Sequence, residues 1–515
     1  MRSESINNKG REFRVGLLLN YFATAVGLIS SLVFNPIIIR ALGQSEYGLY
    51  ETMGSFVNNL AILDLGFGSV IVRYTAKYEK EGLLQRRDEF LYTARRIYQY
   101  LGLAILIGGA FLYSLLGTVF GNSFSSEELR KAHTLFLFVL GTTVLSVYGQ
   151  VYSGALTGVE KFIIPRVIRI IKLVFGKIVC ILVLFLGADS VGYTAVLFVI
   201  EILALVINRL YASYYVQFKK SKIKIKEIKE LLVFTSYILL QAIASQLYWQ
   251  IDKLVLGAMI GTAVVAVYSV SINLQNIVQN ISVSIKDVLL PKATHIAVEG
   301  NNPDRIHSFM VQSSRLVLVV YGIAQFGLII LGKEFITLWI GSEYIEAYRI
   351  LIILSFASLI PSILASGEII SKAYNKHQFL SFVTVFAAVV NLLLTILFVR
   401  RWGMIGAAVA TMIGLVFGNT LIPLLYYKKH FSLNIKSYFI DVFSGILPAL
   451  LMATLIGFGI NLIFTGYNWF ILFLKMIVIC TSYVFALRKF GFTLFENTMF
   501  NNMILKFLTF IRRSK

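Results

Sequence analysis

The sequence predicts an all-α, polytopic membrane protein, and three observations support this fold class. Of its 515 residues, 57% are hydrophobic and 14% are charged, whereas soluble chains average about 45–50% apolar and about 25% charged residues. The mean hydropathy is +0.78. Apolar stretches of the roughly 20 residues that a spanning helix needs recur from one end of the chain to the other.

Fourteen such stretches are expected to cross the membrane. They are 15–39, 45–69, 97–120, 133–157, 165–187, 190–213, 231–257, 262–290, 309–332, 347–371, 379–399, 403–427, 438–464 and 469–487. The first of them is too long for the core of a signal peptide, so we expect it to be retained as a span.

The distribution of Lys and Arg predicts the orientation of these spans. With the N-terminus inside, the inner loops and span ends hold 37 of the 47 basic residues, and the outer ones hold 7. Cytoplasmic loops carry such an excess, so both termini are expected to be cytoplasmic. The same excess accounts for the net charge of +21. Nucleic-acid binding is therefore not expected, because no compact basic domain lies outside the spans.

The two halves of the chain resemble each other across a basic linker at 217–230. With a shift of 218 residues, Tyr50 falls on Tyr268 and Asn58 falls on Asn276. Each half has six spans, so both enter the membrane in the same direction, and the halves are expected to be related by a pseudo-two-fold axis along the membrane normal. The expected domains are an N-terminal six-helix lobe at 1–216, the linker at 217–230, a second six-helix lobe at 231–430, and two additional spans with a tail at 431–515.

Polar side chains follow helical spacing along the hairpin at 231–291. One stripe holds Gln241, Ser245, Tyr248 and Asp252, and the next holds Ser269, Asn273, Asn276, Asn280, Ser284 and Asp287. Residues at such steps share one helix face. A face of this kind cannot meet lipid, because unpaired polar groups in hydrocarbon cost several kcal/mol each. We therefore expect a hydrated transport cavity. Its candidate lining residues are Asn35, Glu51, Asn58, Tyr248, Asp252, Lys253, Asn273, Asn276 and Asn280.

Charges inside the predicted spans are further candidates, because they are costly there and usually functional. Asp252 and Lys253 are adjacent, about 100° apart on a helix, and cannot pair with each other. They have either a cavity role or structural partners on neighbouring helices. The carboxylates of Glu51, Glu201 and Glu368 are candidate sites for a coupling proton or cation.

A cationic ladder enters the fifth span from its inner end. Its members are Arg166, Arg169, Lys172 and Lys177. Lys177 lies near the middle of the span, too deep for a loop charge. Because Arg and Lys bind phosphate through charge-assisted hydrogen bonds, the ladder is a candidate pyrophosphate site. Ordinary anchoring at the inner membrane face is the alternative for the first three.

No motif of a soluble catalyst or metal site is present. The chain has no phosphate-binding glycine loop, HExxH, CxxC or nucleophile elbow. Its five histidines have no metal-ligand spacing, and its two cysteines lie in separate apolar stretches. We expect no cofactor, no metal and no enzymatic activity.

Two segments resemble the polysaccharide-export flippases of the multidrug/oligosaccharidyl-lipid/polysaccharide exporter superfamily. They are Leu28–Tyr78, with the run LGQSEYGLYETMGSFVNNLAILDLGFGS, and Tyr248–Ser271, YWQIDKLVLGAMIGTAVVAVYSVS. The resemblance implies two six-helix lobes around a central cavity. It also implies that an undecaprenyl-pyrophosphate-linked oligosaccharide moves from the inner to the outer leaflet of the bacterial cytoplasmic membrane by alternating access, for O-antigen, capsule or exopolysaccharide assembly. The implied partners are the lipid-linked substrate, membrane lipids and glycan polymerase machinery, with the chain acting as a monomer.

Two other functions are compatible with many spans. A cation-coupled multidrug antiporter of the same superfamily would place carboxylates against aromatic surface to hold an organic cation. The amide stripes and the cationic ladder favour a sugar-phosphate cargo instead. A membrane glycosyltransferase or glycan polymerase would have acidic residues on a large outer loop, and this chain has only short ones.

Overall fold

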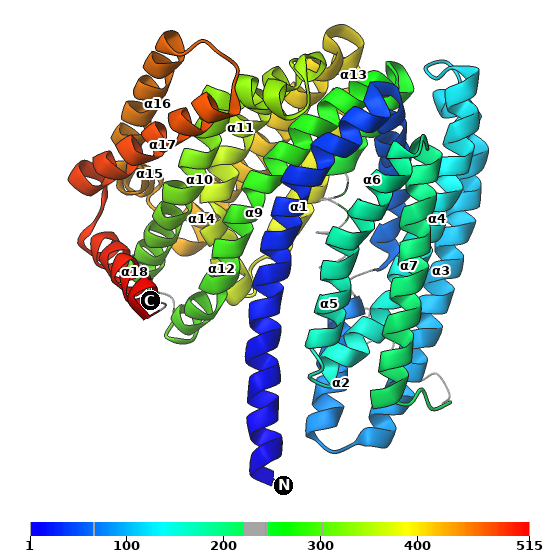
Figure 1. The fold of residues 1–515 in the computed structure, drawn as a ribbon. Helices are drawn as coiled ribbons and strands as arrows, with labels where there is room; N and C mark the ends of the chain where they lie inside the picture. The colour runs from blue at the N-terminus through cyan, green and yellow to red at the C-terminus, as the bar shows by residue number, and fades with distance from the viewer. Residues whose placement is uncertain are drawn as a thin grey trace. The chain divides into compact units, whose positions relative to one another are not determined.

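The computed structural model describes residues 2–64, 67–220, 243, 246, 248–300 and 302–513. In this part of the chain every regular element is helical (Figure 1). Nine of the described helical segments are long and apolar enough to cross a membrane, so an all-α polytopic protein is confirmed, while the number of fourteen spans stays a prediction. Gln241, Ser245 and most of the linker at 217–230 lie outside the described residues.

Two of the nine segments, 40 and 54 residues long, each contain a glycine with non-helical backbone angles. In α1 (Arg2–Asn58) the glycine is Gly43, with φ 74° and ψ 177°. In α13 (Gln378–Val416) it is Gly403, with φ 55° and ψ −136°. A positive φ costs glycine little and other residues much. These two bends lie between pairs of spans that the sequence predicts as separate.

The residues divide into two compact units. The first comprises 1–269 and 388–407. Its helices are α1, α2 (Phe67–Lys80), α3 (Leu84–Phe120), α4 (Ser126–Gly158), α5 (Ile163–Ile171), α6 (Lys177–Phe185) and α7 (Ser190–Tyr215), with the helical residues 248–259. A 3-10 turn, Asn59–Asp64, follows α1, and a π-helical turn, Lys172–Gly176, joins α5 to α6. The buried core of this unit is formed by α2, α3, α4 and the end of α1, and includes Tyr98, Phe120, Phe136 and Tyr152.

The second unit comprises 270–387 and 408–515. It contains most of α9 (Thr262–Val298), then α10 (Pro303–Trp339), α11 (Ala347–Ile363), α12 (Ala365–Ala373), both ends of α13, α14 (Ile422–Phe431), α15 (Ile435–Phe443), α16 (Ile446–Ile463), α17 (Trp469–Ala486) and α18 (Leu494–Arg513). Its core includes Met310, Leu318, Ile363, Tyr438 and Leu450. The units differ from the halves of the sequence repeat, because 248–269 and 388–407 belong to the first unit. The lobe boundaries inferred from the repeat stay a prediction.

Two buried ion pairs attach the last helices of the second unit to α10. The Lys475 Nζ of α17 donates to the Glu334 Oε2 of α10 at 2.7 Å, and both side chains are at least 92% buried. Arg315 of α10 donates to both carboxylate oxygens of Glu496 of α18, at 2.7 and 2.9 Å. Its remaining donors reach backbone carbonyls, namely those of Asp441 and Ser444 at 2.8 Å and that of Gly491 at 2.6 Å. Arg315 therefore connects three segments of the chain through one planar group.

Candidate functional site

Asp252 and Lys253 of the first unit have separate partners on different helices, as their angular separation requires. Lys253 Nζ donates to Glu51 Oε2 of α1 at 2.6 Å, and the two side chains are 7% and 17% exposed. The Asp252 carboxylate accepts hydrogen bonds from Tyr268 Oη at 2.6 Å and from Thr395 Oγ1 at 3.0 Å. Both charged residues are thus held by other helices of the same unit, and a contact with substrate stays a prediction.

The face of α1 that carries Glu51 continues as a polar contact with the helical segment at 248–259. Ser55 Oγ donates to Gln250 Oε1 at 2.8 Å. Asn58 is exposed, and its carbonyl accepts a long bond of 3.4 Å from Gln246. Gln246, Gln250 and Lys253 recur at steps of four and three, so they share one face. The stripe predicted from the sequence lies on the opposite face with Tyr248, which is buried, and does not include the two glutamines.

The cationic ladder divides into members with different partners. Lys172 forms an ion pair with Glu201 of α7. Lys177 Nζ instead donates to the neutral Asn35 Oδ1 of α1 at 2.8 Å. Arg166 Nη1 donates to its own helix, at the Phe162 carbonyl, 3.0 Å away. Arg169 is exposed.

A π-helical turn lies between the two lysines of the ladder. Residues five apart on an α-helix point about 140° away from each other. In the turn Lys172–Gly176 the hydrogen bonds run from i to i+5, and the wider turn brings Lys177 closer to the face of Lys172. Such π turns are frequent at functional sites. The sequence spacing alone did not reveal it.

The amide stripe of α9 is solvent-accessible in the structure. Asn276 and Asn280 are exposed, and Asn273 is partly exposed. Polar side chains on a spanning helix cannot face lipid, so their exposure is consistent with a water-facing surface. The side chain of Asp287 lies outside the described ones.

The neighbouring face of α9 carries a second polar stripe that was not predicted from the sequence. Gln275 and Gln279, four residues apart, both donate to the buried Tyr321 hydroxyl of α10, at 3.3 and 3.1 Å. Gln275 also donates to Ser358 Oγ of α11 at 2.6 Å, and Gln325 donates to Tyr321 Oη at 2.5 Å. These groups hold α9, α10 and α11 together. Their only signal in the sequence is a pair of amides at a helical step.

Cysteine substitution separates the two faces of α9. In a protein whose Cys180 and Cys480 have been replaced, cysteine at Asn276 or Asn280 is expected to react with a membrane-impermeant thiol reagent. Cysteine at the buried Gln275 is expected to be protected. Protection of both asparagine positions under all transport conditions would contradict a water-facing role.

Each carboxylate predicted as a coupling-ion site forms an ion pair with a lysine. Glu51 pairs with Lys253 and Glu201 with Lys172, whereas Glu368 pairs with Lys372 one turn away, at 2.7 Å on a more exposed surface. In the described ranges, no group of three or more His, Cys, Asp or Glu side chains could hold a metal ion.

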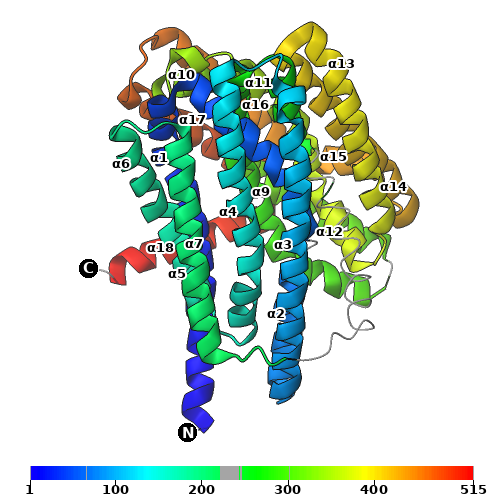
Figure 2. The ribbon, with the colours of Figure 1, turned by 90° about the vertical axis from the view of Figure 1, so that its right-hand side faces the viewer.

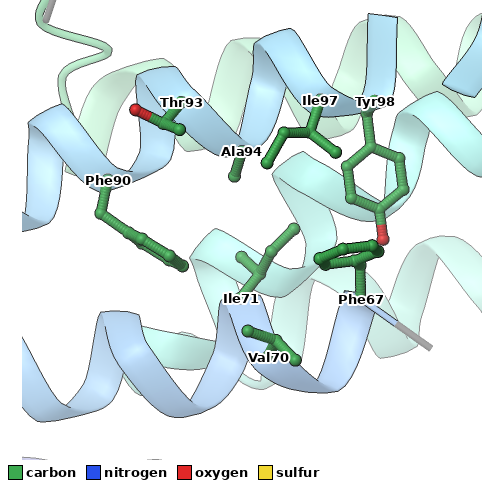
Figure 3. Close-up of a pocket in the computed structure, with 8 residues that line it drawn as sticks. All are labelled: Phe67, Val70, Ile71, Phe90, Thr93, Ala94, Ile97 and Tyr98. Carbon is green, nitrogen blue, oxygen red and sulfur yellow. The ribbon is translucent and has the colours of Figure 1, made fainter. Parts of the chain in front are cut away.

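A small pocket between α2 and α3 has a largely apolar lining. Figure 3 shows its lining of Phe67, Val70, Ile71, Phe90, Thr93, Ala94, Ile97 and Tyr98. None of the predicted site residues contributes to it. Its apolar walls offer no counter-charge to a phosphate group, so we do not assign substrate binding to it.

The long apolar helices define a multi-pass membrane protein. The model of a family described as "Polysaccharide biosynthesis protein" matches residues 16–297. This match covers more than half of the chain, and the chain belongs to that family. The resemblance stated from the sequence is thereby confirmed.

Individual relatives are distant. A "Putative O-antigen transporter" of Shigella flexneri is 22% identical over 427 residues, which cover 79% of this chain and 96% of that protein. The "Probable low-salt glycan biosynthesis flippase Agl15" of Haloferax volcanii is 23% identical over 211 residues. That match covers 41% of this chain and only 44% of the relative. These relatives are described as a transporter and a flippase, and the prediction of a transporter rather than an enzyme is confirmed.

Solved structures show the same fold at low identity. The lipid II flippase MurJ in an inward closed conformation has a TM-score of 0.70 and 18% identity, covering 92% of this chain and 97% of that one. An inward-facing multidrug resistance transporter of the MATE family has a TM-score of 0.55 and 15% identity, with coverage of 78% and 94%.

Proposed function

We propose that this protein is a flippase that moves an undecaprenyl-pyrophosphate-linked oligosaccharide from the inner to the outer leaflet of the bacterial cytoplasmic membrane. The product would serve the assembly of a cell-surface polysaccharide. The family, the relatives described as a flippase and an O-antigen transporter, and the fold support this proposal. Both termini would be cytoplasmic, in accord with the bias of basic residues. The protein would act as a monomer that delivers its cargo to glycan polymerase machinery.

The observation that carries the proposal is the partner of Lys177. Among the described intramembrane lysines, Lys172, Lys253 and Lys475 each pair with a glutamate, whereas Lys177 contacts only the neutral amide of Asn35. A partly buried ammonium without a counter-charge is costly. A pyrophosphate would supply that charge through short, charge-assisted hydrogen bonds. Arg169, exposed on α5 before the π-helical turn, would provide an earlier contact for the same anion.

The lining of the transport path is proposed unit by unit. In the first unit it would include Asn35, Glu51, Asn58 and the segment with Asp252 and Lys253. In the second it would be the exposed face of α9 with Asn273, Asn276 and Asn280. Amides bind sugar hydroxyls as both donors and acceptors, which suits a glycan cargo.

Alternating access could be coupled to an ion at the paired glutamates. Protonation of Glu51 would release Lys253, and protonation of Glu201 would release Lys172, in each case uncovering a cation for the substrate. Glu368, more exposed, would act at the surface of the second unit. The candidates thus link proton binding to the availability of positive charge.

A reconstituted assay tests this function against the multidrug alternative. Full-length protein in liposomes is expected to move a fluorescent undecaprenyl-pyrophosphate oligosaccharide between leaflets, measured by quenching of the outer leaflet with a membrane-impermeant reductant. Empty liposomes are the control. Transport of a fluorescent organic cation without movement of the lipid-linked sugar would reject the flippase in favour of the antiporter.

A further inference from the structure

A cluster of arginines and aromatic rings in the first unit is not used by the proposed transport path. It lies toward the predicted inner ends of α3, α4 and α7, where α4 runs between the other two helices (Figure 2). We call it the basic–aromatic cluster, and its members are Tyr92, Arg95, Arg96, Tyr148, Tyr152, Arg209, Phe218 and Lys220.

The Arg95 guanidinium lies at the centre of this cluster, against two rings. Its Cζ is 5.5 Å from the centroid of Tyr92 and 5.1 Å from that of Phe218. The Phe218 ring in turn packs edge-on against Tyr152, with centroids 5.5 Å apart. Stacking of this kind fixes the plane of a guanidinium and leaves its edge for other partners. The Arg95 Nε is shielded from solvent and has no hydrogen-bond partner within the described residues.

Two tyrosine hydroxyls of α4 lie among the arginines. Tyr148 Oη and Tyr152 Oη are 3.0 Å apart, so one donates to the other. Arg95 and Arg209 both act electrostatically on the Tyr152 hydroxyl, and Arg96 acts on that of Tyr148. Lys220 adds a further positive charge near Tyr92. Hydroxyl and guanidinium donors from three helices therefore converge on one region.

No ion pair within the described residues neutralises the positive charge of the cluster. Ion pairs formed within the described part of the chain include none of Arg95, Arg96, Arg209 and Lys220. Nearby Arg87 shows the contrast, because it pairs with both Glu79 and Asp88, at 2.5 and 2.7 Å. Several like charges held close together repel one another, and an anion between them would relieve this repulsion.

The position of the cluster indicates the kind of anion. Tyrosines and arginines at a helix end are typical of the level of lipid headgroups, and basic pockets between spanning helices bind anionic headgroups. We propose that the basic–aromatic cluster binds the phosphate of an anionic phospholipid, with Arg95 and Arg209 as its principal contacts and the partly exposed Tyr148 hydroxyl as a further donor. That the leaflet is the cytoplasmic one rests on the proposed orientation, whereas the binding itself does not depend on flippase activity.

Native mass spectrometry of the purified full-length protein tests this site, with phosphatidylglycerol as the probe and phosphatidylcholine as the uncharged comparison. The double variant Arg95→Gln, Arg209→Gln is expected to weaken phosphatidylglycerol binding by about tenfold or more. The variant Tyr148→Phe, which keeps all charges, is expected to weaken it by about threefold. Phosphatidylcholine binding should be the same in all variants, and unchanged elution from a sizing column shows that the variants are folded.

The matched control removes two charges from the same membrane face outside the cluster. Lys80 and Arg86 are both exposed near the turn between α2 and α3, and the variant Lys80→Gln, Arg86→Gln is expected to retain wild-type binding. Equal losses in both double variants would show a non-specific charge effect and overturn the proposal. Displacement of the lipid by millimolar inorganic phosphate would also overturn it, since the site would then be one for a soluble phosphate.

Discussion

Replacing Lys177 with alanine is expected to lower glycan export by about 100-fold, because truncating one partner of a hydrogen-bonded charge pair in a desolvated site costs several kcal/mol. The amount of protein in the membrane should stay the same, since Asn35, the described partner of Lys177, is neutral and can be hydrated without it. Export would be measured as surface polysaccharide in cells that depend on this protein, with its level followed by immunoblotting.

Two further variants distinguish a lost anion site from a damaged helix. Asn35→Asp leaves Lys177 in place but gives it a carboxylate, so export is expected to fall as in the alanine variant. The double variant Arg349→Gln, Glu346→Gln removes an exposed ion pair that lies outside the proposed transport path, and export should stay within about threefold of the wild type. Normal export by both Lys177→Ala and Asn35→Asp would exclude Lys177 from the pyrophosphate site.

Local properties of the chain were predictable because they depend on short-range chemistry. Hydropathy over about 20 residues locates spanning helices without knowledge of their neighbours. The break predicted between the first two spans coincides with Gly43, whose positive φ only glycine adopts readily. The separation of Asp252 and Lys253 followed in the same way from the pitch of one helix.

The partners of the charged residues were not predictable, because they come from distant parts of the chain. Glu51 and Lys253 are 202 residues apart, and Arg315 and Glu496 are 181 apart. One sequence contains no signal that links such positions. For the same reason the sequence does not reveal that Glu51 pairs with Lys253, or that Lys172 and Lys177 of the ladder have different partners.

Which polar face of α9 is buried was also not predictable from the sequence. Amides follow helical spacing on two neighbouring faces of this helix. Periodicity alone therefore could not distinguish the exposed Asn276 from the buried Gln275. Gln275 is buried because the hydroxyl groups of Tyr321 and Ser358 accept hydrogen bonds from its amide. Burial of a polar stripe therefore depends on which neighbouring helix offers hydroxyl groups, and this is a property of the packed structure.

Replacing Arg315 with methionine is expected to lower the free energy of unfolding by about 3–5 kcal/mol, because it leaves a buried carboxylate without its counter-charge and several carbonyls without their donor. The side chains of Arg315 and Glu496 are only 4% and 6% exposed. The measurement is the midpoint of denaturant unfolding in detergent micelles. Glu496→Gln should cost less, since Arg315 keeps its bonds to the carbonyls of Asp441, Ser444 and Gly491.

An exposed ion pair provides the matched control. Arg305 and Glu299 are 60% and 54% exposed, and Arg305→Gln is expected to change the free energy of unfolding by less than about 1 kcal/mol. An equal loss in Arg305→Gln and Arg315→Met would contradict the special role of the buried pair.

The pH dependence gives an independent check of the same pair. Burial by itself would raise the pKa of Glu496, but hydrogen bonds from Arg315 and from the Thr493 N–H lower this pKa below its ordinary value of 4.5. A carboxylate whose pKa is lowered on folding stabilises the folded protein above the ordinary pKa, and this contribution is lost as the pH falls through the lower, folded value. The difference in stability between the wild type and Arg315→Met should therefore shrink on acidification, and the decline should begin above pH 4.5, because in the variant burial raises the pKa of Glu496 with no arginine to lower it. A difference that stays unchanged on acidification would mean that Arg315 stabilises the fold through its backbone carbonyl contacts alone.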